Sequence, residues 1–275
     1  MTEMLQYQFF RLALLGVLII SVAAAVIGTY IIARRLVAIS GGITHACFGG
    51  LGLGYYLGIN PIATAAVFAV ASSLGVEAMS RRLSVREDSA IAVVWSIGMA
   101  IGVLFVFMTP GYVPELNSFL FGNILTVSVD DIVAFAVFTA ALLLFIAIWF
   151  RQIVACAFDR DFARIQGLPV TFISTVMTVM TAICIVLTIR LVGIMLLMSM
   201  LSLPMLVAEV WVHRFAPLMA VSVLVSALCS VGGLFIAAVI DVPASAVIVL
   251  LMTAAFVLSR GLHALVVRRR LGRGV

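Results

Sequence analysis

The amino-acid sequence predicts an all-α polytopic membrane protein with eight or nine transmembrane helices. Of its 275 residues, 65% are hydrophobic and only 10% are charged, and the mean hydropathy is +1.33. Soluble domains usually contain about 45–50% apolar and about 25% charged residues. A soluble core could not bury so much apolar surface, so we expect a bilayer to solvate it. No segment resembles a soluble domain, and residues 1–275 are expected to form a single transmembrane domain.

Apolar segments of about 20 residues, the length needed to cross about 30 Å of hydrocarbon, follow one another along the chain. Turn-forming residues separate several of them, at Asn60-Pro61, Pro110-Gly111, Gly167-Leu168-Pro169, Pro217 and Pro243. Only Arg190 separates the sixth segment from the seventh, which leaves the count at eight or nine. The second segment is rich in glycine and is a candidate for a bend or a break. The expected spans are 12–33, 37–58, 61–80, 90–108, 129–150, 170–189, 191–211, 217–240 and 245–263.

The basic residues indicate how the spans are oriented. All 16 are arginines, and with nine spans nearly all of them fall on one side of the membrane. The positive-inside rule assigns that side to the cytoplasm, so we expect the N-terminus outside and the C-terminus in the cytoplasm. The other side carries Glu115 and Asp241, with Arg11 and Arg190 as basic exceptions. The expected cytoplasmic groups are Arg34-Arg35; Arg81, Arg82 and Arg86; Arg151, Arg160 and Arg164; Arg214; and Arg268-Arg269-Arg270 with Arg273.

The same composition argues against several classes of function. A net charge of +5 could suggest a nucleic-acid partner, but orientation in a membrane explains it better, and we expect no nucleic acid. The chain contains no lysine, which excludes a Walker A phosphate-binding loop. It also contains no HExxH motif and no clustered pair of catalytic groups. We therefore expect no enzyme activity, and if ATP drives this protein, another subunit must bind it.

The loop at 151–169 is expected to contain a short helix. Asp159 can cap its N-terminus, and Gly167 before a proline can end it. Phe162 and Ile165 lie three residues apart on one side of this helix, while two arginines lie on another. A helix of about two turns is unstable alone in water, so it should pack against something. It is either a solvated amphipathic connector or a docking element for a cytoplasmic partner.

His45 is the candidate functional residue within the membrane. It lies ten residues after Arg35, or about 15 Å along a helix, which is half of the hydrocarbon thickness. An ionisable group at this depth is costly and usually functional. A neutral imidazole is a good ligand for divalent transition metals. The alternative is a histidine that only forms hydrogen bonds between helices.

Other polar and sulfur-containing residues are weaker candidates. Cys47 could join His45 at one ion only if the helix is broken there, because positions i and i+2 do not share a face. Glu77 and Glu209 fall near the cytoplasmic ends of their spans, where pairing with a nearby arginine accounts for them. Glu209 and His213 could form a second polar patch on the exit side. Core filling is the simplest role for the methionines of one stretch, Met195, Met198, Met200 and Met205.

Short motifs are spread over nearly the whole chain. They are Phe9-Phe10-Arg11-Leu12-Ala13-Leu14, Arg34-Arg35-Leu36, Thr44-His45-Ala46 with Gly49-Gly50, Asp161-Phe162-Ala163-Arg164, Gly167-Leu168-Pro169-Val170, Leu191-Val192-Gly193 with Pro204, Gly233-Leu234, Asp241-Val242-Pro243 and Ala246-Val247-Ile248-Val249-Leu250. None is decisive alone, but their order and spacing together are specific. They resemble the membrane permease subunit of ATP-binding-cassette (ABC) importers for zinc, manganese or iron.

The resemblance implies a homodimeric permease in the bacterial inner membrane, surrounded by lipid. Its partners would be a cytoplasmic ABC ATPase dimer and an extracytoplasmic metal-binding protein. The divalent metal ion would be the transported substrate, and no cofactor would be bound permanently. The segment near 159–167 would be the coupling helix that contacts the ATPase, through Asp159, Asp161, Phe162, Ala163, Arg164 and Gly167. His45 would correspond to the histidine of the family's gate and metal site.

One departure from the family pattern leaves the cargo open. The usual motif has an aspartate four residues before this histidine, and here that position is Gly41. Other groups could complete the site, the ion could be held more weakly, or a different metal could pass. A secondary carrier or an ABC permease for another small solute remains the alternative. An ion-coupled carrier would be expected to use intramembrane carboxylates, and the only mid-span titratable group is His45.

Overall fold

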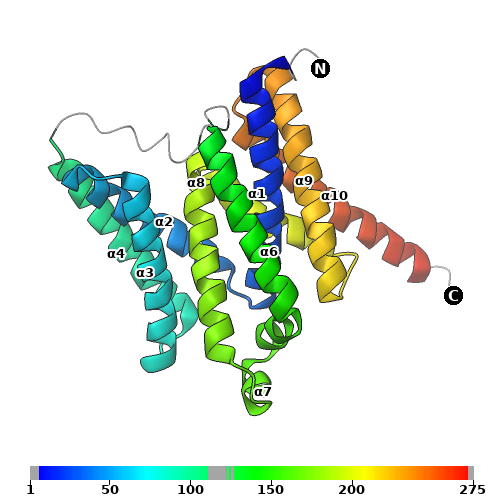
Figure 1. The fold of residues 1–275 in the computed structure, drawn as a ribbon. Helices are drawn as coiled ribbons and strands as arrows, with labels where there is room; N and C mark the ends of the chain where they lie inside the picture. Colours follow the sequence, from blue (N-terminus) through cyan, green and yellow to red (C-terminus); the bar gives the residue numbers. More distant parts are fainter. Residues whose placement is uncertain (1–5, 111–121, 123, 125–126, 272–275) are drawn as a thin grey trace.

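The computed structural model describes residues 6–110, 122, 124 and 127–271, with side chains up to residue 266. Within these ranges the chain is helical and contains no strand, so the predicted all-α fold is confirmed. The N-terminus and α7 lie at opposite ends of the bundle, which we call the N-terminal end and the α7 end (Figure 1). The helices are α1 (Gln8–Ala33), α2 (Val37–Leu57), α3 (Pro61–Arg82), α4 (Glu87–Met108), α6 (Val129–Phe158), α7 (Arg160–Ile165), α8 (Val170–Glu209), α9 (Phe215–Ile240) and α10 (Ala244–Leu271).

Local sequence signals account for where helices begin. The Asn60 side chain accepts hydrogen bonds from the first free backbone amides of α3, and Pro61 occupies the first helical position, where its missing N–H costs nothing. At the start of α6, Ser128 and Asp131 form a reciprocal capping box. These caps satisfy backbone donors that the helices themselves cannot pair.

Eight helices in the described part of the chain are long and apolar enough to cross a membrane. The longest, α8, has 40 residues and would extend about 60 Å if straight, twice the hydrocarbon thickness. It is broken at Gly193, whose φ of 75° and ψ of 172° are non-helical and suit glycine. The break divides α8 into two arms.

The two arms of α8 run in opposite directions along the bundle. The first arm begins directly after α7, at the α7 end. At the end of the first arm, Leu191 lies beside Gly16 of α1, and in the second arm Leu201 lies against Gly28, so the second arm follows α1 back toward the α7 end. Among the eight candidate spanning helices of the described residues, α8 alone therefore corresponds to two of the predicted spans, which explains why the sequence supported both counts.

Most arginines of the described residues gather at the α7 end, while Arg260 lies within α10. The Arg11 and Arg190 exceptions lie toward the N-terminal end, and Arg190 forms an ion pair with the buried Asp131 of α6. Glu115 and the side chains of Arg268–Arg270 and Arg273 lie outside the described residues. The arginines at the α7 end are Arg34, Arg35, Arg81, Arg82, Arg86, Arg151, Arg160, Arg164 and Arg214.

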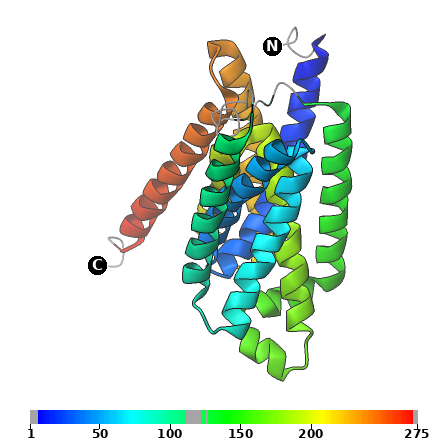
Figure 2. The same cartoon turned by 90° about the vertical axis from the view of Figure 1, so that its left-hand side faces the viewer.

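Helices α2, α3 and α4 pack together on one side of the bundle, as both views show (Figures 1 and 2). The glycine-rich α2 is continuous from Val37 to Leu57, so the predicted bend or break is wrong. Its glycines instead allow neighbouring backbones to approach closely. A side-chain carbon placed on Gly98 of α4 would lie 2.5 Å from the Ala46 Cα of α2, and Gly52 meets Gly102 in the same way.

We therefore expect Gly98→Ala to destabilise the protein, because the obstructing atom belongs to a backbone that cannot rotate away. Overpacking of this kind costs about 1–3 kcal/mol. Thermal unfolding in detergent would measure the change. Gly75→Ala in α3 is the matched control, since nothing lies within 4 Å of the added carbon and alanine favours the helix. Equal melting temperatures for the two variants would contradict the close packing of α2 on α4.

Candidate functional site

His45 lies near the middle of α2 and is half-buried in the bundle. Its ring stacks on the indole of Trp95 from α4, with the ring centroids 4.5 Å apart and the planes inclined by 4°. The stack covers one face of the imidazole and fixes its orientation, while the ring nitrogens lie at the edge. Trp95 itself is 40% exposed, so the pair lies at the boundary of the packed interior.

Cys47 does not share this site. Because α2 is unbroken, residues 45 and 47 project from different sides of the helix. The Cys47 side chain is buried in the core, as are those of Cys156, Cys184 and Cys229, and all four thiols are free. The alternative in which Cys47 and His45 bind one ion is therefore wrong for this structure.

The space beside Gly41 is filled by two other side chains. A side-chain carbon placed on Gly41 would lie 2.9 Å from the Met198 methyl group of α8 and 4.0 Å from the Trp95 ring. A thioether and an indole thus occupy the position next to His45 where the family motif has a carboxylate. The described residues contain no group of three or more histidine, cysteine, aspartate or glutamate side chains that could hold a metal ion. The His45 imidazole is of the type that binds divalent transition metals, and the Met198 side chain packs on the same face of α2.

Sequence reasoning did not identify Trp95, and it assigned the methionine stretch to the core. Met200 and Met205 are buried, as expected for core filling, whereas Met195 is exposed. Met198 is partly buried and reaches the face of α2 that carries the imidazole. No local signal links residue 95 or 198 to His45, because the contacts depend on which helices pack against α2.

The short helix expected at 159–167 is α7, and it projects from the bundle (Figures 1 and 2). The Asp159 carboxylate accepts hydrogen bonds from the backbone amides of Asp161, at 3.0 Å, and Phe162, at 2.9 Å. Gly167, with φ of 74°, follows the end of the helix. Ala163 is fully buried and faces the bundle.

The outer face of α7 is apolar. Phe162 is 54% exposed and Ile165 is 85% exposed. Arg164 is also exposed and lies 3.6 Å from Asp161, in a loose ion pair with little stabilising effect. Two large apolar side chains on a projecting helix are unusual for a solvated connector and typical of a docking surface.

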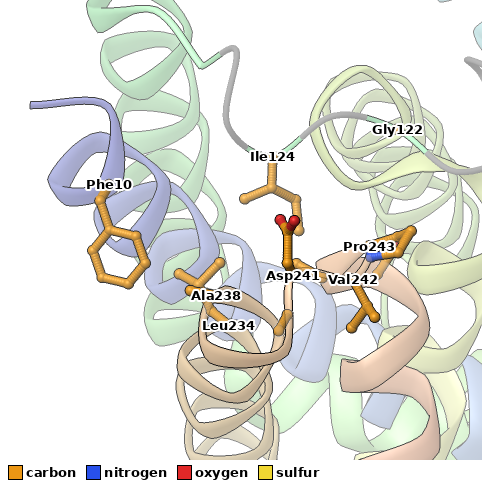
Figure 3. Close-up of a pocket in the computed structure, with 11 residues that line it drawn as sticks. Phe10, Gly122, Ile124, Leu234, Ala238, Asp241, Val242 and Pro243 are labelled. Carbon is orange, nitrogen blue, oxygen red and sulfur yellow. The ribbon is translucent and has the colours of Figure 1, made fainter. Parts of the chain in front are cut away.

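Two cavities lie at opposite ends of the bundle. At the N-terminal end a cavity of about 220 Å³ lies between Phe10, Ile124 and the turn from α9 to α10, and Figure 3 shows the Asp241 carboxylate directed toward it. At the α7 end a cavity of about 460 Å³ is lined by Glu209, His213 and Arg35 among apolar residues.

The intramembrane acids have different surroundings. Glu77 pairs with Arg81 and accepts a hydrogen bond from the Thr175 hydroxyl at 3.2 Å, as local pairing predicted. Glu209 ends α8, so its four-residue spacing from His213 is not helical, but both residues line the same cavity.

A bundle of long apolar helices, eight of them able to span a membrane within the described residues, defines a polytopic membrane protein. Comparison with known families is more specific. The model of the ABC 3 transport family matches residues 6–262, and the chain belongs to this family. It is a multi-pass protein of the bacterial inner membrane.

Its relatives include several named transport proteins. A probable metal transport system membrane protein of Chlamydia pneumoniae is 37% identical over 84% of this chain and 81% of its own length. A probable iron transport system membrane protein of Haemophilus influenzae is 30% identical over 94% of both chains. The solved structure of PsaBC from Streptococcus pneumoniae in complex with Fab matches with a TM-score of 0.82 at 28% identity, covering 94% of this chain and 93% of that one.

Proposed function

We propose that this chain is the membrane permease subunit of an ATP-driven importer for a divalent transition-metal ion. Two copies would form the membrane pathway, and a separate ATPase dimer would supply the energy. The observation that carries the proposal is His45, an imidazole in the middle of a spanning helix that is oriented by a stacked indole. Of the three metals that the resemblance implies, relatives named for manganese and iron transport favour those two over zinc.

The two ends of the bundle would have different partners. The arginine-rich α7 end would face the cytoplasm, as the positive-inside rule requires, and α7 would dock on the ATPase through Phe162 and Ile165. The N-terminal end would receive the metal-loaded binding protein near the cavity of Asp241. ATP-driven closure of the ATPase would switch the bundle between outward and inward access, and His45 would contact the ion on its way.

The proposal predicts uptake that depends on ATP. The permease and its partner ATPase would be reconstituted in liposomes with ATP inside, and binding protein loaded with manganese, iron or zinc would be supplied outside. We expect accumulation of one or more of these metals only when both subunits and ATP are present. Uptake by the permease alone, driven by an ion gradient, would instead identify a secondary carrier.

A further inference from the structure

Four polar side chains at the α7 end form a cluster that we call the Glu87 network: Arg34, Glu87, Arg160 and Ser174. Arg160, the first residue of α7, donates hydrogen bonds to Glu87 Oε1 at 2.9 Å and to Ser174 Oγ at 2.8 Å. Arg34, which ends α1, donates to the same Glu87 oxygen at 3.3 Å. One carboxylate oxygen therefore joins two guanidinium groups from different parts of the chain.

The carboxylate balances two positive charges in a sheltered place. The side chain of Arg34 is only 6% exposed, and those of Arg160 and Glu87 are about 30% exposed. Burial, and then the neighbouring Arg34 guanidinium, lower the pKa of Arg160, while Glu87 acts in the opposite direction. Without the carboxylate the two guanidinium groups would repel each other at a partly buried site, so Glu87 helps to hold α7 in its present place.

A stiff path leads from this network to the imidazole. Glu87 is the first residue of α4, and Trp95 follows eight residues later, about 12 Å along the helix. Trp95 stacks on His45, and beyond it the α4 backbone is pressed against α2 at Gly98 and Ala46. Because no flexible side chains separate these backbones, α2 and α4 should move as one body.

We infer that Glu87 is a positioning residue that transmits the movement of α7 through α4 to the His45–Trp95 pair. This inference rests on the proposed function, because it assigns the force on α7 to the ATPase. The Arg160–Glu87 ion pair joins α7 directly to α4, and Trp95 carries the displacement to the face of the imidazole. Energetic coupling of this kind travels through contiguous packed and hydrogen-bonded elements.

The test is Glu87→Gln in the complete reconstituted complex. Glutamine keeps the shape but removes the charge that holds the two arginines, while the apolar outer face of α7 is untouched. We expect the ATPase to bind and hydrolyse ATP, and the amount of metal transported per ATP to fall at least severalfold. Glu77→Gln is the matched control, since Glu77 also pairs with an arginine at this end of the bundle but does not contact α7. An unchanged transport ratio in Glu87→Gln would overturn the inference.

A spectroscopic readout separates transmission from simple stability. With Trp149 and Trp211 replaced by phenylalanine, the emission of Trp95 reports the surroundings of His45. ATP should change that emission in the complex with wild-type Glu87 and in Glu77→Gln, and it should fail to do so in Glu87→Gln. If Glu87→Gln does not fold, Arg160→Met breaks the same link and leaves Glu87 paired with Arg34, so no unpaired carboxylate is buried. A wild-type emission response in Arg160→Met would also overturn the inference.

A measurement on the permease alone distinguishes this inference from the proposed function. A spin label at the exposed Ile165 should become more mobile in Glu87→Gln than in Glu77→Gln, because α7 loses its tie to α4. Equal mobility would count against the network whatever the transport assays show. Absence of ATP-driven uptake by the wild-type complex would count against the proposed function and leave the mobility result standing.

Discussion

His45→Ala is expected to reduce metal uptake in the reconstituted system at least about tenfold, while the permease still folds and binds its ATPase. His45 is the one histidine that the described residues place near the middle of a span, and we propose it as the metal ligand, a role that the thioether of Met198 cannot fill. Loss of groups that merely orient metal ligands costs about 10- to 100-fold, so loss of the ligand itself should reduce uptake at least about tenfold. Initial rates of uptake of the preferred metal would measure this.

Two further variants separate ligation from packing. His45→Phe keeps an aromatic ring opposite Trp95 but has no nitrogen lone pair, so it should fail in transport as His45→Ala does. His263→Ala makes the same substitution at a histidine that packs edge-on against Trp211, away from α2, and should transport normally. Wild-type uptake by His45→Phe would show that the ring at position 45 serves only to pack α2 against α4.

The helices and their order could be predicted from the sequence because the bilayer imposes one length on every span. Their ends agree with the predicted spans to within a few residues, except where a helix continues well past the predicted span, as α6 does to Phe158 and α10 does to Leu271. The boundary between the sixth and seventh spans was expected at Arg190 and lies at Gly193. Arg190 remains within the helix because its charge is paired with Asp131, so it does not need to leave the bundle.

The surroundings of the candidate site could not be predicted in the same way. From the sequence, the glycines of α2 could have marked a break in the helix or a close contact with another helix. The position of α4 in the structure shows that they form a close contact. The stack of Trp95 on His45 and the contact of Met198 with Gly41 join three different spans. Without knowledge of which spans are neighbours, no periodicity in the sequence connects these residues.

In the loop at 151–169 too, the local structure could be predicted from the sequence but the packing could not. Its helix and cap follow from Asp159 and Gly167, which act on adjacent backbone. The sequence does not indicate which face of this helix packs against the bundle. In the structure Phe162 and Ile165 point outward, whereas Ala163 and Arg160 point inward. A helix that merely connected two spans would be expected to turn its large apolar residues toward the bundle, and their exposure is what the proposed docking on the ATPase would explain.

Phe162→Asp is therefore expected to prevent stable association with the ATPase, and with it ATP-driven uptake. A large aromatic side chain at the centre of a small interface commonly contributes about 2 kcal/mol or more, which corresponds to roughly a 30-fold change in Kd. Phe162 is more than half exposed in the permease, so the variant should fold and keep its melting temperature. Copurification of the two subunits, followed by a titration of ATPase binding, would measure the loss.

Leu83→Asp provides the control for that experiment. Leu83 directly follows α3 at the same end of the bundle and is 67% exposed. Leu83→Asp therefore replaces an exposed apolar side chain outside α7 with the same charged one. If α7 is the docking element, Leu83→Asp should retain the ATPase and Phe162→Asp should not. If both variants lose ATPase binding equally, docking would involve the whole arginine-rich end of the bundle. The ATPase would then not act on the bundle mainly through α7. If Phe162→Asp still binds the ATPase as the wild type does, the exposed apolar face of α7 is not the surface that docks on the ATPase.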